Sequence, residues 1–233
     1  MWPSVSGGLH ATWLGRVPYL EAWRLQEAVG SRVRAGAPGR LLLLEHDPVY
    51  TIGRRGSVAN LVAGPAELRA AGASVYRVDR GGDITYHGPG QLVGYPIVRL
   101  GDPPDLVGHV RALEDAVIAV LGGYRLEGTR IERKTGVWVE IAPSRHAKIA
   151  AIGVRVSRRT TTHGFALNVR TALDAFARMI PCGFAHDVTS LERLGVAVAV
   201  EEVARAAAAA LADRLGAALA WSCLLYTSDA ADE

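Results

Sequence analysis

The sequence predicts a mixed α/β (α+β) protein, in which helices pack on a mixed β-sheet. Strand-like and helix-like segments are interspersed without the strict alternation that a fully parallel sheet requires. The chain has 233 residues, 49% of them hydrophobic, so it can bury a sizeable core as a single domain. No segment repeats at a period of about 20 to 50 residues, which excludes solenoid and propeller architectures.

Helices are predicted where apolar residues recur at helical spacing or where alanine dominates. The turn-forming segment AGAPG ends the first helix, while Pro65 and Gly72 mark the beginning and the end of the second. The last helix is alanine-rich. The predicted helices cover residues 19–34, 65–73, 102–121 and 201–221.

Strands are predicted where apolar and β-branched residues run between turn-forming or charged residues. Pro48 stops the first of these runs. The stretch EIAPSRHA (140–147) is interpreted as a surface loop of uncertain shape. The predicted strands cover residues 41–50, 75–79, 91–98, 135–142, 148–157 and 162–169.

Several classes of protein are disfavoured by simple counts. No run of about eighteen apolar residues is present, so no membrane span is predicted. The first 23 residues lack the basic and apolar regions of a signal peptide, which makes the cytoplasm the predicted compartment. Cys182 and Cys223 are the only cysteines, and neither a disulfide framework nor zinc-ligand spacing is present. We therefore predict no metal site.

The segment CLLYTSDAADE (223–233) differs in period and composition from the helix before it. It resembles the translation of a sequencing-library adapter, so we interpret it as a non-native tail and assign residues 1–222 to one domain. Without the three acidic residues of this tail, the formal net charge rises from +3 to +6. Such a charge can steer an acidic partner, and it is equally consistent with solubility alone. No basic run, helix-turn-helix or RNP pattern indicates nucleic-acid binding.

The stretch RGGDITYHGPGQ (80–91) is the most informative in the chain. Its glycines allow close backbone approach or positive φ at several points, and polar side chains are concentrated beside them. A tight hairpin with a polar turn would account for the same glycines. The stretch is neither a GxGxxG followed by a helix nor a GxxxxGK[ST] loop, so it does not support a phosphate cradle of either kind.

Four single residues are candidates for chemistry. Lys148 heads an apolar strand, where a lysine commonly extends to solvent but can also project into a pocket. Cys182 is either a buried small hydrophobe or a nucleophile. His163 and Asn168 suggest a Cys-His-Asn arrangement, but they precede the cysteine closely, unlike the papain-type order.

These stretches match a known family in order and spacing. The chain resembles the lipoyl(octanoyl) transferases, and the resemblance covers nearly everything from about Trp23 to Leu194. The resemblance implies the single-domain fold of the biotin- and lipoate-protein ligases. The matching motifs are EHDPVYTIGR (45–54), Arg80-Gly81-Gly82, Thr85, Tyr86, His87, Gly90-Gln91, Tyr95, GVWV (136–139), KIAAIG (148–153), HGFALNV (163–169), PCG (181–183) and VTSL (188–191).

The resemblance also implies a mechanism and partners. Cys182 would take an octanoyl or lipoyl group from acyl carrier protein as a thioester, with Lys148 as its partner, and no cofactor would be needed. The group would then pass to a lysine on lipoyl domains of 2-oxoacid dehydrogenases and on the glycine cleavage H protein. Nothing in the sequence demands more than a monomer, which is the state that we predict. The implied acyl-pocket residues are Arg80, Gly81, Gly82, Asp83, Ile84, Thr85, Tyr86, His87, Ala151, Ile152, Gly153, Gly164, Phe165 and Ala166.

Other functions remain open at this point. An ATP-dependent lipoate- or biotin-protein ligase on the same fold would form an acyl-adenylate and would need no cysteine. A thioesterase would discharge the same acyl-enzyme to water. A binding module for carrier proteins or lipoyl domains would have a dead site. Cys182 and the GPGQ continuation of the glycine-rich stretch favour the transferase over the ligase. The pairing of a cysteine with a lysine, without a positioned histidine, disfavours the thioesterase, and the presence of both Lys148 and Cys182 disfavours a dead site.

Overall fold

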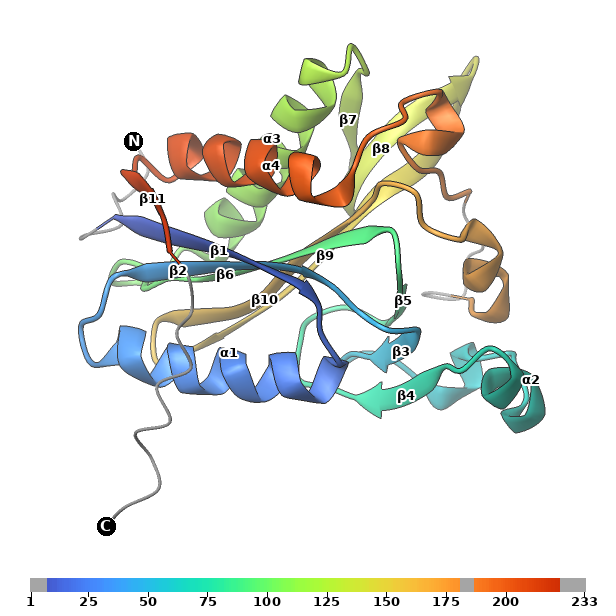
Figure 1. Cartoon of the computed structure of the whole chain (residues 1–233), viewed down its shortest axis with the longest axis horizontal. Coiled ribbons are helices and arrows are strands. Elements are labelled where there is room, and N and C mark those ends of the chain that lie inside the picture. Colours follow the sequence, from blue (N-terminus) through green and yellow to red (C-terminus); the bar gives the residue numbers. More distant parts are fainter. Residues whose placement is uncertain (1–7, 181–186, 223–233) are drawn as a thin grey trace.

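A computed structural model of the chain describes residues 8–180 and 187–222 (Figure 1). A large and a small β-sheet are surrounded by four α-helices and short 3₁₀ segments. The strands are β1 (Leu9–Arg16), β2 (Gly39–Glu45), β3 (Val49–Ile52), β4 (Ser74–Arg77), β5 (Ile84–His87), β6 (Gln91–Ile97), β7 (Gly128–Ile131), β8 (Lys134–Ala142), β9 (Arg145–Ser157), β10 (Thr160–Asn168) and β11 (Leu219–Trp221). The helices are α1 (Tyr19–Arg34), α2 (Pro65–Ala70), α3 (Leu106–Gly123) and α4 (Val200–Arg214), with 3₁₀ segments η1 (Val58–Asn60), η2 (Leu173–Arg178) and η4 (Glu192–Leu194).

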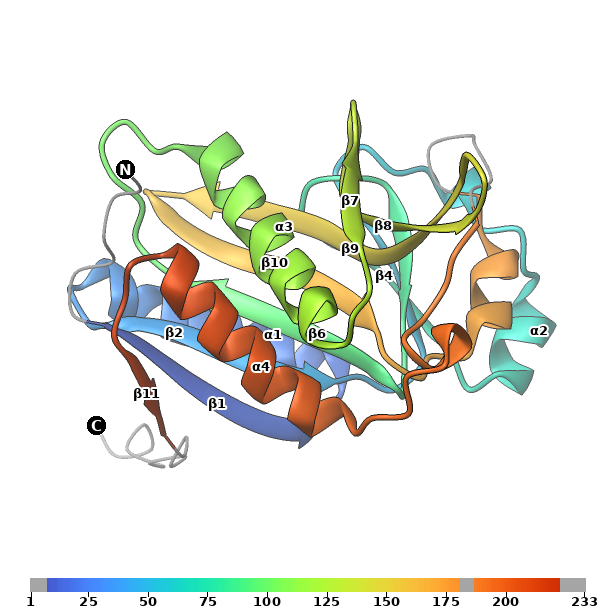
Figure 2. The ribbon, with the colours of Figure 1, turned by 90° about the horizontal axis from the view of Figure 1, so that it is seen from above.

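The large sheet has eight strands in the order β11-β1-β2-β6-β10-β9-β8-β7. The pairings of β1 with β11 and with β2 are parallel, and the others are antiparallel. Helices α3 and α4 pack together across one face of this sheet, and α1 covers the other (Figures 1 and 2). The predicted mixed sheet packed by helices is therefore confirmed.

The small sheet has the order β4-β3-β5 and lies beside α2 at one end of the molecule (Figure 1). Strand β5 belongs to this sheet, whereas β6, which follows it after a three-residue turn, belongs to the large one. The glycine-rich stretch 80–91 therefore crosses from one sheet to the other and is not a simple hairpin. This crossing brings its polar residues to the junction of the two sheets.

The leucines of β2 explain why this strand is buried on both faces. Leu41 and Leu43 pack in the core beneath α3 and α4, while Leu42 and Leu44 pack in the core beneath α1. All four are inaccessible to solvent. Because successive side chains of a strand point to opposite faces, a continuous apolar run is typical of a strand covered on both sides.

The predicted helix 201–221 is too long. Helix α4 ends at Arg214, and Gly216 then adopts a left-handed φ of +59° while the Ala217 N–H donates to the Ala212 carbonyl. This is the capping geometry that favours glycine just after a helix. The residues beyond Gly216 include β11, which pairs with β1. The sequence patterns predicted neither of these two strands.

The predicted loop 140–147 is a regular hairpin. Strand β8 continues to Ala142 and β9 begins at Arg145, so only Pro143 and Ser144 form the turn. Ser144 has a positive φ of +61°, and its N–H donates to the Glu140 carboxylate. Residues 140–145 are exposed, so the surface location was predicted correctly.

Candidate active site

A cavity of about 1130 Å³ lies where the two sheets meet. Its wall is formed mainly by β5 of the small sheet, by β6, β8, β9 and β10 of the large sheet, and by η2. The wall also includes Lys148, together with most of the residues that the sequence analysis assigned to an acyl pocket. The three separate sequence stretches that carried the prediction therefore meet at one place.

Lys148 lies near the start of β9, with its side chain on the cavity. Its backbone N–H donates to the Asp187 carbonyl at 2.8 Å, and its carbonyl accepts the Thr189 N–H at 3.0 Å. Val188 thus forms a parallel bridge to Lys148. The chain that follows the PCG motif is in this way hydrogen-bonded beside the lysine.

The predicted nucleophile, Cys182, lies outside the described residues. The described residues on either side of it, Ile180 and Asp187, both line the cavity. The Ile180 N–H donates to the Asn60 carbonyl at 2.8 Å. The chain therefore borders the cavity both before and after the segment that contains the cysteine.

Two of the predicted pocket residues are not part of the cavity wall. The ring of Tyr86 packs instead in a core cluster, against Tyr50 and Phe176. Gly81 donates its N–H to the Val154 carbonyl, which ties the glycine-rich stretch to β9. The predicted residues that do line the cavity are Arg80, Gly82, Asp83, Ile84, Thr85, His87, Ala151, Ile152, Gly153, Gly164, Phe165 and Ala166.

Arg80 holds the glycine-rich stretch against β3. Its Nη2 donates to the Thr51 carbonyl at 2.6 Å and to Thr51 Oγ1 at 2.9 Å, and its Nη1 donates to the Gly81 carbonyl. Burial lowers the pKa of this guanidinium. A Cβ on Gly53 would lie 2.5 Å from the Gly82 carbonyl oxygen, so the close approach of the two segments requires glycine there.

A chain of hydrogen bonds runs from the pocket to the segment beside Lys148. His87 Nδ1 donates to Gln91 Oε1 at 2.8 Å, and Gln91 Nε2 donates to Asn168 Oδ1 at 2.9 Å. Asn168 Nδ2 in turn donates to the Thr189 carbonyl at 3.0 Å. Burial places the pKa of His87 well below its usual range, so this ring is neutral near pH 7.

Tyr95 was quoted as a motif residue, but its place in the site was not predicted. Its hydroxyl donates to His46 Nε2 at 2.7 Å, since His46 Nδ1 donates to the Val17 carbonyl. Burial lowers the pKa of His46 to about 4 and raises that of Tyr95 well above its usual range. Both groups are therefore neutral and held in one orientation.

The sequence analysis also assigned no place in the pocket to Tyr19 or Trp138, which line the cavity. Trp138 lies within the quoted GVWV motif, whereas Tyr19 lies before the region of resemblance. Aromatic residues on buried strands and helices are more often core residues than site residues, so sequence alone carried no signal for them.

His163 and Asn168 both lie on the cavity wall but do not form a pair with each other. His163 Nε2 bonds Asp79 Oδ1 at 2.8 Å, and Asp79 also forms an ion pair with Arg155. The hydrogen bond from His163 is the main cause that lowers the pKa of Asp79. These partners differ from those of a Cys-His-Asn protease site, in which the amide orients the imidazole.

Within the described ranges, no three His, Cys, Asp or Glu residues are grouped so that they could hold a metal ion. Within the same part of the chain, no helix has the length and apolar character that a membrane crossing requires.

Comparison with known proteins identifies the family. Residues 18–212 match the model of the lipoyl protein ligase A/B catalytic domain. The octanoyltransferase of Solibacter usitatus is 50% identical over 192 residues, which cover 82% of this chain and 85% of that protein. The octanoyltransferase of Mycobacterium sp. (strain KMS) is 50% identical over 214 residues, covering 90% and 86%. The chain belongs to the octanoyltransferases.

The comparison with solved structures shows the fold. A bi-partite lipoate protein ligase from Thermoplasma acidophilum has the same fold, with a TM-score of 0.75 and 19% sequence identity over 92% of this chain and 86% of that chain. The fold class expected from the sequence is confirmed. Membership in this family makes the protein an acyltransferase that transfers octanoyl groups in protein lipoylation.

Proposed function

We propose that the protein moves an octanoyl group from acyl carrier protein to the ε-amine of a lysine on lipoyl domains, through a thioester on Cys182. The observation that supports this proposal is the placement of Lys148 on a cavity that the chain borders on both sides of Cys182. The cavity wall contains most of the residues that the family resemblance assigns to an acyl chain. The 2-oxoacid dehydrogenases and the glycine cleavage H protein are the proposed sources of acceptor domains, and the cytoplasm is the proposed compartment.

The first half of the reaction is a thioester exchange. The Cys182 thiolate attacks the octanoyl carbonyl, so a new C–S bond forms while the C–S bond to the carrier breaks. The departing carrier thiolate takes a proton from the Lys148 ammonium. A neighbouring cation favours the thiolate form of a cysteine, which is the nucleophile.

The second half forms the amide. The neutral amine of the acceptor lysine attacks the octanoyl-Cys182 carbonyl, and the C–S bond breaks as the C–N bond forms. Lys148, now a neutral amine, accepts the proton that the attacking nitrogen loses. The cycle ends with the thiolate and ammonium with which it began, so neither ATP nor a metal is required.

Intact-protein mass spectrometry tests the acyl-enzyme. After brief mixing with octanoyl-acyl carrier protein, the protein should gain one hydroxylamine-labile octanoyl group, and Cys182→Ala should not. Cys223→Ser serves as the control, because it removes the other thiol and should be acylated like the parent. Addition of apo lipoyl domain should discharge the thioester onto the domain.

The same experiment separates the alternative functions. If the proteins stay unmodified while octanoate and ATP together octanoylate the domain, the protein is a ligase. If the thioester forms but yields only free octanoate, it is a thioesterase. Sedimentation analysis tests the proposed monomer. Removal of residues 223–233 should leave the melting temperature unchanged if the proposed domain is 1–222.

A further inference from the structure

Lys148 and Trp138 form a cross-strand pair between β9 and β8. The Lys148 Nζ lies 4.7 Å from the centroid of the indole ring. This distance is within the range of about 6 Å over which an ammonium is attracted to an aromatic face, and tryptophan is the strongest aromatic partner. Trp138 is only 2% exposed, so its ring is held by the packing around it.

A β-bulge is what places the two side chains opposite each other. Val137 pairs with Ala150, but the next residue, Trp138, pairs with Lys148, so Ile149 has no partner in β8. Val137 and Val139 of β8 both lie in the core beneath α3 and α4, and so do the successive residues Ile149 and Ala150 of β9. The extra residue is therefore in β9, and the bulge brings Lys148 to the cavity side, where the indole is.

Gly136 lies next to the bulge on β8, where the two strands approach closely. This residue has a φ of +120°, and a Cβ at this position would lie 2.5 Å from the Ala150 carbonyl oxygen. Only glycine is accommodated at such a φ and such a close approach. The Trp138 Nε1–H then reaches back across Gly136 and donates to the Lys134 carbonyl at 3.3 Å, which fixes the plane of the ring.

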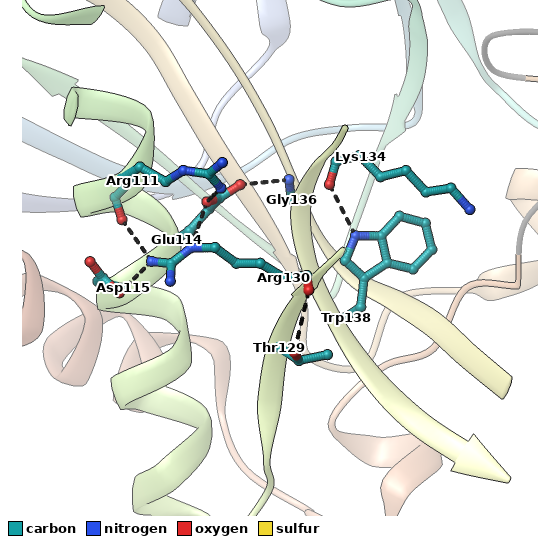
Figure 3. A network of polar contacts seen from close by, with 8 residues as sticks. All are labelled: Arg111, Glu114, Asp115, Thr129, Arg130, Lys134, Gly136 and Trp138. Atoms are coloured by element: carbon teal, nitrogen blue, oxygen red, sulfur yellow. Dashed lines mark hydrogen bonds and ion pairs between the residues drawn. The ribbon is translucent and has the colours of Figure 1, made fainter. Parts of the chain in front are cut away.

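A buried carboxylate on α3 holds this part of β8 (Figure 3). Glu114 Oε1 accepts the Gly136 N–H at 3.1 Å. Its Oε2 accepts from Arg111 at 2.6 Å and from Arg130 of β7 at 2.8 Å, and Arg130 also pairs with Asp115. The Glu114 side chain is 1% exposed. One carboxylate thus joins α3, β7 and β8 two residues before Trp138.

We propose that Trp138 is a positioning residue that holds the Lys148 ammonium in place for acyl transfer. Glu114 fixes β8, the strand that carries Trp138. This inference rests on the proposed function. An aromatic face attracts the ammonium without bringing a negative charge, whereas a carboxylate there would offset the positive charge that a thiolate needs. The ring also favours the protonated form to which Lys148 returns in each cycle.

Other charged groups lie around this pair. Lys134, on β8, has its Nζ 5.6 Å from the centroid of the same indole ring. Arg145, on β9, forms an ion pair with Asp187, whose backbone is hydrogen-bonded to Lys148. These groups are the same in every variant below, so a difference among the variants reports on the ring itself.

The test uses three variants in the full chain, all carrying Cys223→Ser so that Cys182 is the only thiol. Trp138→Leu removes the aromatic face, and Trp138→Phe retains a weaker one. Trp221→Leu is the matched control, because Trp221 forms a cation–π contact with Arg205 and lies on β11, at the opposite end of the strand order from β8 and β7. The rate of thioester formation with octanoyl-acyl carrier protein is measured against donor concentration and pH, alongside melting temperatures.

We expect Trp138→Leu to lower kcat about tenfold with little change in KM, and to move the alkaline limb of the pH profile down by roughly half a unit to one unit. Trp138→Phe should fall between it and the parent, while Trp221→Leu should match the parent. The proposal is overturned if Trp138→Leu keeps the parent rate and pH profile. It is equally overturned if Trp138→Phe, the variant more certain to fold, shows the parent profile while Trp138→Leu is merely unstable. A parent that forms no thioester would instead refute the proposed function.

Discussion

The Tyr95 hydroxyl donates a hydrogen bond to His46 Nε2 at 2.7 Å, in a part of the molecule where His46 is inaccessible to solvent. His46 Nδ1 is already committed to the Val17 carbonyl. Because burial lowers the pKa of His46 to about 4, the ring is neutral near pH 7, and with Nδ1 donating, Nε2 accepts from the Tyr95 hydroxyl. One tyrosine on the cavity wall fixes both the tautomer and the orientation of a histidine behind it.

Replacing this tyrosine should destabilise the fold. Tyr95→Phe leaves the ring in place but removes the donor, so His46 Nε2 becomes a buried acceptor without a partner. We expect a loss of about 1 to 3 kcal/mol in the free energy of unfolding, measured by urea denaturation. Tyr124→Phe is the control, because Tyr124 is only half-buried. Equal stabilities of Tyr95→Phe and the parent would show that the bond contributes nothing.

The fold should lose stability in mild acid. Burial lowers the pKa of His46 and of His109 from 6.5 to about 4, so between these values the unfolded chain binds protons that the folded chain does not. The free energy of unfolding must therefore decrease as the pH falls from about 6.5 towards 4. At about pH 5 each histidine should cost about 2 kcal/mol. Urea denaturation near pH 7.5 and near pH 5 measures the difference.

His109 offers a direct check of this acid sensitivity. Both of its ring nitrogens are buried without a hydrogen-bond partner within the described structure. His109→Leu should remove its part of the acid slope and stabilise the protein by about 1 to 2 kcal/mol at neutral pH. His10→Leu, at a half-exposed strand position, is the control and should leave the stability at neutral pH unchanged. An undiminished slope in His109→Leu would contradict the assignment.

The ion pairs of the buried Glu114 should contribute far more to the free energy of unfolding than an exposed ion pair does. Glu114→Gln uncharges a carboxylate that two arginines and the Gly136 N–H contact, and we expect a loss of about 3 kcal/mol in unfolding free energy. Glu201→Gln breaks an exposed pair with Arg205 on α4, where about 0.5 kcal/mol is typical. Chemical denaturation of both variants gives the comparison, and equal losses would refute it.

The sequence predicted the helices and most strands because their patterns are local. It did not predict β11, since Gly216 can interrupt a helix or simply weaken it, and only the neighbouring edge of β1 makes the following residues a strand. The short strand β1 was not predicted for the same reason, because a local stretch of sequence does not show the strands with which it pairs. Such choices depend on contacts between residues about two hundred positions apart, which no local window contains.

The sequence predicted the candidate-site residues that lie in motifs, and it missed those whose place depends on packing between distant segments. Lys148 and the predicted pocket residues stood in the motifs that carried the family resemblance. The role of Trp138 depends on a bulge that skips Ile149 and on a carboxylate of α3, and neither is visible in the spacing of GVWV. Positioning residues are therefore the part of a site that a structure adds to a sequence.

The proposed pocket predicts how chain length is selected. Ala151 lies on β9 three residues beyond Lys148 and lines the cavity, so Ala151→Leu should fill space that an octanoyl chain would occupy. Each methylene that cannot be buried costs about 0.8 kcal/mol, so three would lower kcat/KM for the octanoyl donor roughly 10- to 100-fold. A butyryl donor, which is too short to reach that space, should be affected much less.

Competition between octanoyl- and butyryl-acyl carrier protein gives the ratio directly. Ala220→Leu, at an exposed position of β11, is the control and should keep the preference of the parent. If Ala151→Leu slows both donors equally, the added side chain disturbs the reacting groups and not the acyl chain. In that case, the octanoyl chain does not run past Ala151. A selective loss for the octanoyl donor would place its methylenes between β9 and the glycine-rich stretch 80–91, and the small residues of both segments would then determine which chain length is accepted.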